Sequence, residues 1–392
     1  MDEYFFVLTA INIFVLAFMG ILVSISETLN IKQRRSFITA YMLIALISVI
    51  ELATVVLEEL PGQYRILNII ANFLGFGLTP AVPLCLVNVL TKKVDAKLHL
   101  GRAALCELIY LVFLAASIPF GLVFSVDADN VYSRGAYFMV YVITYYASIL
   151  YLMLATLYTA GYFQNRSKTL IVPITAFLIG GTTLQIVFPY IHVTWLCVTL
   201  ISVMYFIYCN EMWTQLDGLT GLLNQNSYLN RTAEKHADDR LMIVFDVDSF
   251  KQVNDTYGHL IGDKCLMVVA DCIKKAYSKY GFCYRIGGDE FCVLMKNASA
   301  ADKCTDKFIR LLEKRRAEQS FIPHVSYGFS ELSVNENILT AKERADQNMY
   351  IFKKEHKRRL SIEAALSEAR AAKSSAEAED GKAADDVPAT IA

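Results

Sequence analysis

The 392-residue sequence has few charged residues and no pattern of paired cysteines. Lysine, arginine, aspartate and glutamate make up only 19% of the chain and nearly cancel, leaving a formal net charge of −1. A balance this neutral argues against a nucleic-acid binder that relies on a basic surface. The nine cysteines form neither a CxxC pair nor a zinc-finger spacing with histidine, and their odd number disfavours a disulfide framework. The first apolar stretch lacks a preceding basic segment and is too long for a cleavable signal peptide.

Apolar residues, by contrast, make up 55% of the sequence, and the charged residues are concentrated after about Glu211. Seven apolar stretches precede that point, each long enough to cross a bilayer as a helix of about 20 residues. They lie near 4–26, 37–57, 66–90, 104–126, 136–162, 169–188 and 191–210. Only Phe188-Pro189-Tyr190 separates the last two, so a six-span arrangement also fits the sequence. The pattern predicts an all-α polytopic membrane domain of seven transmembrane helices over residues 1–210.

The loops between these stretches alternate in charge. The loops after the first, third and fifth stretches are basic, whereas the others are mixed or uncharged. The basic residues are Lys32, Arg34, Arg35, Lys92, Lys93, Lys97, Arg102, Arg166 and Lys168. Because basic loops stay in the cytoplasm, we expect the N-terminus outside and the C-terminal domain inside a bacterial cytoplasmic (inner) membrane.

Five polar side chains inside the apolar stretches are candidates for sensing a signal. Burying a charge in hydrocarbon is costly, which singles out Glu51 and Glu107, with Asn12, Asn68 and Asn72 behind them. The alternative is structural and is the one that such residues more often fit: the asparagines form interhelical hydrogen bonds, and the glutamates lie near helix ends or water. A transporter with an accessory enzyme is a further alternative, although no internal repeat is apparent.

From 211 to 360 the pattern is that of a soluble α+β domain. An apolar run ends at Asp246, a helical pattern covers 263–280, and two strand-like runs flank Gly287-Gly288. Glycine pairs favour tight hairpin turns because glycine tolerates positive φ. Another strand is predicted at 324–329 and a helix at 341–352. The remaining residues, 361–392, are of low complexity and predict a disordered tail.

Acidic residues occur at two turns of this domain, in Asp246-Val-Asp248 and in Gly287-Gly-Asp289-Glu290. If the hairpin pairs beside the first strand, Asp246 and Asp289 converge at one end of the sheet. Two converging carboxylates repel each other unless a cation lies between them, and Mg²⁺ accepts a few carboxylates together with phosphate oxygens. Such a cation would suit phosphoryl chemistry. Each turn taken alone also fits a solvated loop.

Four motifs together resemble the GGDEF family of diguanylate cyclases. The segment Arg285-Ile-Gly-Gly-Asp-Glu-Phe291 is similar to the motif after which that family is named. The other three are Asp217-Gly-Leu-Thr-Gly-Leu-Leu-Asn224, the segment 246–263 beginning Asp-Val-Asp-Ser-Phe-Lys, and Ala345-Asp-Gln-Asn-Met-Tyr-Ile-Phe-Lys353. The resemblance covers roughly 216–358 and implies a fold like that of adenylyl cyclases and polymerase palm domains.

The resemblance also implies a role for each matching residue. Asp246 and Asp289 would bind Mg²⁺ (or Mn²⁺) with the carbonyl of Val247, and Glu290 would assist catalysis. Asn254 and Asp263 would bind guanine, and Asp263 favours GTP over ATP. Triphosphate contacts would come from Phe250, Lys251 and Lys353, although both lysines also fit a plain surface role. Asp248 and His259 would support the fold.

Three departures from the family pattern bear on activity and control. Gln225 follows Asn224 where arginine is common, which would weaken a contact between subunits. The closing segment continues to Lys357-Arg358 instead of Gly-Arg-Asn, so Lys357 or Arg358 would supply a second phosphate contact. The inhibitory product site of the family, Arg-x-x-Asp, is replaced by Ser278 and Gly281, so we expect no inhibition through it.

The function implied is a membrane-bound diguanylate cyclase that condenses two GTP into cyclic di-GMP and two pyrophosphates. Each protomer would bind one GTP, so a homodimer is expected for catalysis, with the lipid bilayer as the other partner and no nucleic acid. The alternative is a catalytically inactive GTP-binding module that signals through partners. Only about six residues separate the seventh stretch from Asp217, so a signal sensed in the membrane domain would pass directly along that helix.

Overall fold

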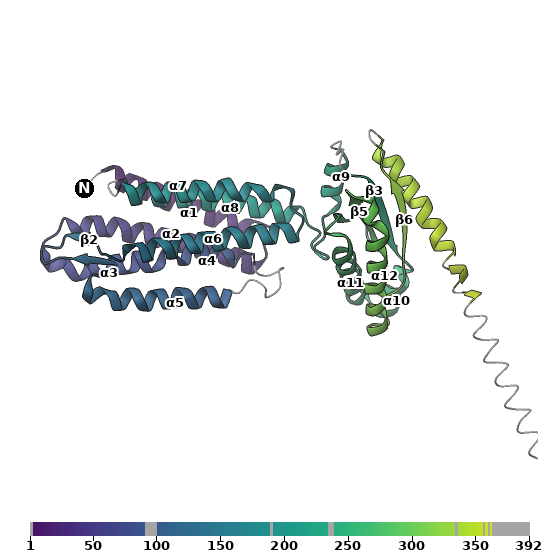
Figure 1. The fold of residues 1–392 in the computed structure, drawn as a ribbon, viewed down its shortest axis with the longest axis horizontal. Coiled ribbons are helices and arrows are strands. Elements are labelled where there is room, and N and C mark those ends of the chain that lie inside the picture. The colour runs from purple at the N-terminus through teal and green to yellow at the C-terminus, as the bar shows by residue number, and fades with distance from the viewer. Residues whose placement is uncertain are drawn as a thin grey trace, which may run out of the picture. The chain divides into compact units, whose positions relative to one another are not determined.

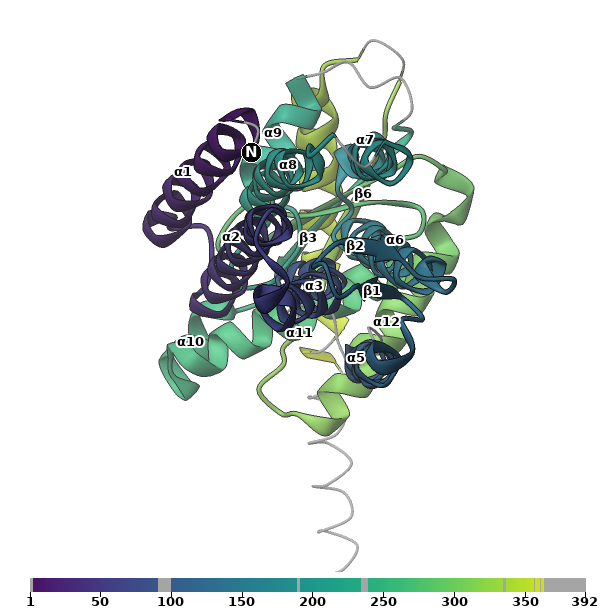
Figure 2. The same ribbon diagram turned by 90° about the vertical axis from the view of Figure 1, so that its left-hand side faces the viewer.

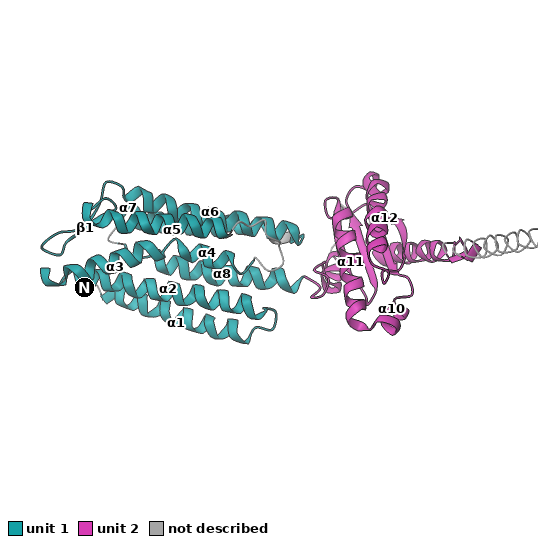
Figure 3. Ribbon diagram, turned by 90° about the horizontal axis from the view of Figure 1, so that it is seen from below, with its two compact units in different colours: residues 1–215 teal, residues 216–392 magenta. Residues whose placement is uncertain are grey.

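The computed structural model describes residues 3–90, 100–188, 191–233, 239–333, 336–355, 357–359 and 361–362 (Figure 1). The chain divides into two compact units, residues 1–215 and 216–392 (Figure 3). Helix α8 continues to Thr214, so the first unit extends beyond the expected limit at position 210. The expected disordered tail lies almost wholly outside the described residues.

The first unit is a helical bundle. Its helices are α1 (Glu3–Ile25), α2 (Ile31–Glu58), α3 (Arg65–Leu78), α4 (Ala81–Val87), α5 (Leu100–Ser117), α6 (Phe138–Tyr162), α7 (Ile171–Val187) and α8 (Thr194–Thr214). Within the described residues, seven helical segments are long and apolar enough to cross a membrane, as the sequence predicts. Helix α2 packs against α1, α3, α4 and α8. Helices α1 and α5 lie at opposite outer edges when the bundle is viewed along its length (Figure 2).

Two of the expected spans differ in detail. The third consists of α3 and α4, which meet at Thr79-Pro80 because proline has no N–H to continue the helical ladder. The fourth ends earlier than the expected position 126. A short 3₁₀ turn containing Pro119 follows α5, and Gly121, with φ of 60°, then turns the chain away from the helix.

The residues after Gly121 form a small hairpin at one end of the bundle. Strand β1 (Phe124–Val126) pairs antiparallel with β2 (Tyr132–Arg134). Asn68 on α3 donates to the carbonyl of Asn130 at 3.2 Å and to its side chain at 3.0 Å, and Asn72 donates to the Asn68 side chain at 2.8 Å. The expected interhelical role of these asparagines is therefore only partly right, because the chain of bonds joins α3 to the hairpin loop.

The second unit is built on a four-stranded antiparallel sheet with the order β4-β5-β3-β6. The strands are β3 (Leu241–Val247), β4 (Gly281–Arg285), β5 (Glu290–Met295) and β6 (Val325–Glu331). The helices are α9 (Gln225–Ala233), α10 (Phe250–Tyr257), α11 (His259–Tyr277), α12 (Ala301–Glu318) and a helix over 338–355. This order confirms the α+β fold, although α11 begins before the expected position 263.

The sheet has a packed layer on each face. Alternate β3 residues, including Phe245, join Tyr277 of α11 and Phe308 of α12 in the main core. On the other face the helix over 338–355 lies close to β6. A Cβ on Gly328 would overlap backbone atoms of Ala345 and Met349, so only glycine permits this approach. That close packing brings the C-terminal helix to the end of β3.

Candidate active site

The two acidic turns meet at one end of the sheet, as the sequence predicts. Asp246 in β3 lies directly opposite Glu290 in β5, and the N–H of Val247 donates to the carbonyl of Asp289 at 3.3 Å. After β3 the chain turns sharply through Ser249, whose φ of 54° is unusual for a residue with a side chain. That turn starts α10 immediately beside the acids.

The carboxylates of Asp246 and Asp289 influence each other. Partial burial raises the pKa of Asp289 above its ordinary value of 3.8, and the negative charge of Asp246 raises it further. Both causes disfavour the ionised form of Asp289, because burial removes water and a like charge repels it. A cation between the two side chains would reverse this effect.

Lys353, from the helix over 338–355, already brings a positive charge to these acids. Its ammonium group forms an ion pair with Asp246 and lies 3.2 Å from Oδ1 of Asp248. Partial burial lowers the pKa of Lys353, but the hydrogen bonds and charges of Asp246 and Asp248 together outweigh burial and raise it overall. Lys353 is therefore part of the acidic site, and its contact with a triphosphate stays a prediction.

Asp248 has a supporting role, as expected. Ser326 in β6 donates from its hydroxyl to both carboxylate oxygens of Asp248, at 3.0 and 2.9 Å. The N–H of Asp248 also donates to the carbonyl of His324 at 2.9 Å. These bonds fix the loop between β3 and α10 against the neighbouring strand.

The acids suit Mg²⁺ that is shared with a substrate more than a metal ion held by protein alone. Among the described residues, no group of three or more His, Cys, Asp or Glu side chains could hold a metal ion. Mg²⁺ commonly takes only one or two protein carboxylates and completes its octahedron with phosphate oxygens and water. Asp246 and Asp289 provide that donor set, so the residues fit the expected cofactor.

The hairpin turn differs from the expected tight glycine turn. Neither Gly287 nor Gly288 has positive φ, and four residues, 286–289, separate β4 from β5. The turn is closed by the N–H of Ile286, which donates to the carbonyl of Glu290 at 3.0 Å. A Cβ on Gly288 would meet no atom within 4 Å, whereas one on Gly287 would crowd Glu290. The absence of a side chain at Gly288 therefore keeps the space beside the acids open.

Arg285 fixes this turn, a role that the sequence reasoning missed. Its guanidinium donates to the carbonyl of Gly288 from Nε at 3.2 Å and from one terminal nitrogen at 2.7 Å. The other terminal nitrogen pairs with Asp217 at 3.2 Å. The sequence offered one signal for this role: Arg285 and Asp217 carry opposite charges, and each lies in one of the four motifs.

The motif containing Asp217 forms an additional edge of the sheet. Leu223 donates its N–H to the carbonyl of Cys283 at 3.0 Å, and Arg285 returns a bond to the carbonyl of Leu223 at 2.8 Å. Asn224 accepts from the N–H of Ser227 at 2.9 Å and thereby begins α9. Gln225 is the first residue of α9, and nothing in the structure explains its replacement of arginine.

Two glycines position Asn254, one of the two residues proposed to bind guanine. Gly258, with φ of 83°, joins α10 to α11, so that Asn254 on α10 lies against the start of α11. A Cβ on Gly262 would overlap Oδ1 of Asn254, which places the amide beside the residue that precedes Asp263. The Asp263 side chain is exposed there and accessible to a ligand.

The remaining predicted residues fall into two groups. Phe250 packs at the edge of the main core and near Gly262. The side chains of Lys251, Lys357 and Arg358 are exposed. His259 is also exposed, at the first position of α11.

The positions that match the inhibitory product site have a structural explanation. Gly281 begins β4 and is buried against β5, where a Cβ would overlap the carbonyl of Leu294 and lie 2.9 Å from Cα of Met295. An aspartate could not occupy this position without displacing the strand. Ser278 ends α11, where its N–H donates to the carbonyl of Lys274 at 3.0 Å.

Comparison with known proteins identifies the second unit. The family model described as "Diguanylate cyclase, GGDEF domain" matches residues 214–359. Residues 214–359 are a GGDEF domain. The GGDEF domain holds all four motifs and both acidic turns, so the resemblance seen in the sequence is confirmed.

The curated relatives match little more than a third of this chain. Diguanylate cyclase DgcP of Pseudomonas aeruginosa is 35% identical over 162 residues, which are 37% of this chain and 23% of the relative. Diguanylate cyclase DgcS of Shewanella oneidensis is 31% identical over 147 residues, 36% of this chain and 50% of the relative. The chain therefore spans at most half the length of these two relatives. A crystal structure of the GGDEF domain of DgcB from Caulobacter crescentus in complex with c-di-GMP is 30% identical, covering 36% of this chain and 90% of that one, with a TM-score of 0.32.

Proposed function

We propose that this protein is a membrane-bound diguanylate cyclase that condenses two GTP into cyclic di-GMP and two pyrophosphates. The observation that carries the proposal is the convergence of Asp246 and Asp289 at one end of the sheet, with Glu290 opposite Asp246. The matching relatives named diguanylate cyclases support it. An intact acidic pair argues against the inactive GTP-binding module.

Each residue at the acidic site would have a separate role in the reaction. Asp246 and Asp289, with the carbonyl of Val247, would hold Mg²⁺, which when bound stabilises charge on a phosphoryl group. Glu290 would assist deprotonation of the attacking 3′-hydroxyl. Lys353 would turn from the carboxylate of Asp246 to the phosphates once a metal ion neutralises the acids.

The ring-shaped product requires two such sites. Each 3′-hydroxyl attacks the α-phosphate of the other GTP, so each new ester bond releases one pyrophosphate. One protomer binds one GTP through Asn254 and Asp263, and two protomers must therefore face each other. A homodimer, at least during catalysis, follows from this stoichiometry.

The membrane unit would control the reaction. The basic loops favour an orientation with the N-terminus outside and the GGDEF domain in the cytoplasm of a bacterium. Helix α8 ends at Thr214, so only Gln215 and Leu216 precede Asp217, fewer than the six residues expected. Movement of α8 would reach the Asp217–Arg285 ion pair with little intervening chain.

Incubation of the purified full-length protein with GTP and Mg²⁺ tests the proposal. We expect cyclic di-GMP and two pyrophosphates per product, with no product from Asp289→Asn. Glu27→Gln, at an exposed position of the other unit, is a control that leaves the acids intact. A wild-type protein that binds GTP but forms no cyclic di-GMP, even when dimerised by a fused coiled coil, would establish the inactive module instead.

A further inference from the structure

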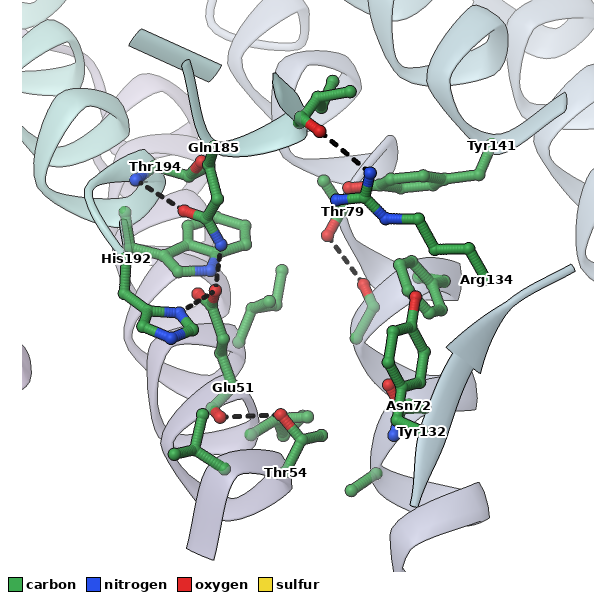
Figure 4. A pocket seen from close by; sticks show the side chains of 18 of the residues that line it. Glu51, Thr54, Asn72, Thr79, Tyr132, Arg134, Tyr141, Gln185, His192 and Thr194 are labelled. Carbon is green, nitrogen blue, oxygen red and sulfur yellow. Dashed lines mark hydrogen bonds and ion pairs between the residues drawn. The ribbon is translucent and has the colours of Figure 1, made fainter. Parts of the chain in front are cut away.

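The membrane unit contains a cavity of about 490 Å³ near the hairpin end of the bundle (Figure 4). Its walls come from α2, α3, α6, α7, α8 and strand β2. A volume of this size is in the range of sites that hold small organic molecules. The lining combines apolar and aromatic side chains with polar and charged ones, so a ligand there would meet both kinds of contact.

Glu51 carries the negative charge inside this cavity. It lies on α2, two turns before the helix ends, and its side chain is only 18% exposed. The amide of Gln185 donates to Oε1 of Glu51, and Nδ1 of His192 lies 3.6 Å from the same oxygen. Oε2 of Glu51 has no hydrogen-bond partner among the described residues, so an acceptor remains available to a ligand.

The other charged groups of the lining lie nearer to solvent. Glu58 and Arg134 are exposed, and Glu58 accepts from the N–H of Tyr132 at 3.1 Å. Arg134 donates to the carbonyl of Ile186 at 2.8 Å and lies over the ring of Phe138, 4.6 Å from its centroid. Two carboxylates against one guanidinium leave the cavity negative overall when His192 is neutral.

Aromatic side chains complete the walls. They are Phe76, Tyr132, Phe138, Tyr141, Tyr145 and Trp195. In Figure 4 Tyr141 and Tyr132 lie across the cavity from Glu51, Gln185 and His192. Aromatic faces attract cations and pack against apolar groups. The combination of one inner carboxylate with aromatic walls selects a cation that has an apolar body.

We propose that this cavity binds a small organic ammonium compound, with its ammonium group at Glu51 and its apolar body against the aromatic walls. The inference deepens the proposed function, because it assigns the input site of the membrane-bound cyclase. Nothing in the binding step depends on catalysis. The ammonium group donates to Oε2 of Glu51, and its positive charge offsets the negative lining.

The side chain of Gln185 joins Glu51 to the start of α8. Gln185 donates from Nε2 to Glu51 and accepts at Oε1 from the N–H of Thr194, 3.0 Å away, at the first position of α8. Trp195, the next residue, also lines the cavity. An ammonium group that draws Glu51 away from Gln185 would therefore free the side chain that accepts from the first residue of α8, the helix whose other end leads into the GGDEF domain.

Trp195 provides a direct readout of binding. The sequence has two tryptophans, so Trp213→Phe leaves Trp195 as the sole reporter in the full-length protein. In lipid nanodiscs we expect 2-phenylethylamine to change the fluorescence of Trp195 in a saturable way. The neutral 2-phenylethanol and the anionic 3-phenylpropionate, which share the same body, should bind about ten-fold more weakly or worse.

Two variants locate the ammonium group. Glu51→Gln in the Trp213→Phe background should weaken the binding of 2-phenylethylamine about ten-fold or more. Glu27→Gln, an exposed acid outside the cavity lining, should leave that affinity unchanged. Equal affinity for all three probes, equal affinity in Glu51→Gln, or the absence of saturable binding would overturn the proposal. Tighter binding of 3-phenylpropionate would assign the cavity to anions through Arg134 and would overturn it as well.

Cyclase assays on the same nanodiscs separate this inference from the proposed function. Saturating 2-phenylethylamine should change the rate of cyclic di-GMP formation in the wild type and leave it unchanged in Glu51→Gln. If neither protein forms cyclic di-GMP, the proposed function fails while the fluorescence titration still decides the binding site. Saturable binding with an unchanged cyclase rate would overturn the input role.

Discussion

Asp246 and Glu290 lie directly opposite each other in the antiparallel pairing of β3 with β5. This register carries Asp289, the residue before Glu290, to the end of β3, where the charge of Asp246 adds to burial in raising its pKa. In the absence of a cation, the repulsion between these carboxylates is unfavourable, as expected of residues that bind a metal ion.

Removing one of these charges should stabilise the metal-free domain. A raised pKa means that the folded state disfavours ionised Asp289, so its cost to folding appears as the pH rises above about 3.8 and persists at neutral pH. We expect Asp289→Asn in a fragment of residues 211–362 to melt about 2 °C higher at pH 7 without Mg²⁺. The exposed Asp263→Asn is the matched control. A lower melting temperature for Asp289→Asn would contradict the electrostatic account.

Arg285 should be required for activity although it is outside the acidic turn. It binds the carbonyl of Gly288 with two donors and Asp217 with another. Lysine cannot reproduce that forked geometry, so Arg285→Lys should lower kcat about ten-fold or more and Arg285→Ala at least as much. Far-ultraviolet circular dichroism would confirm that both variants fold. Full activity of Arg285→Lys would show that charge alone is sufficient.

The stability contributed by Asp217 should depend on pH. Burial raises the pKa of Asp217, but hydrogen bonds from Thr220 and the charge of Arg285 outweigh it, so the pKa is lowered overall from 3.8. A lowered pKa gives stability that is present above the unfolded value and is lost as the pH falls through the folded value. Urea unfolding should therefore separate the wild type from Asp217→Asn at pH 7. The difference should shrink below pH 3.8, and a constant difference would be inconsistent with an ionised Asp217.

Asp263 should determine how tightly GTP binds. If its exposed carboxylate accepts from the guanine N–H groups, as we propose, its loss would leave those donors without a charged partner. We expect Asp263→Ala to raise the KM for GTP about ten-fold or more, with a smaller change in kcat. The neighbouring exposed Lys264→Ala is the control. A KM unaffected by Asp263→Ala would exclude guanine contact there.

Gly281 should be intolerant of any side chain. A Cβ there would overlap the carbonyl of Leu294, so Gly281→Ala should lower the free energy of unfolding by about 1–3 kcal/mol. Gly288→Ala, which meets open space, should change it by less than about 0.5 kcal/mol. Chemical denaturation of the two variants provides the comparison. Equal stability would mean that β4 can move and that an aspartate could be accommodated at 281.

The sequence by itself determined the parts whose signals are local. Seven apolar stretches of sufficient length predicted the membrane helices, and motif order predicted the soluble domain, the acids and the missing inhibitory pair. These signals depend only on composition and on the spacing of residues along the chain. The sequence pattern wrongly extended the fourth helix to position 126, because an apolar segment such as Phe124–Val126 fits a strand as well as a membrane helix.

Only the tertiary structure decided which distant side chains meet. Lys353 reaches Asp246 because Gly328 lets the C-terminal helix pack closely on β6. Glu51 faces Gln185 and His192 because α2 and α7 end at the same side of the bundle. Such contacts join residues more than a hundred positions apart, and they depend on packing that no local pattern encodes.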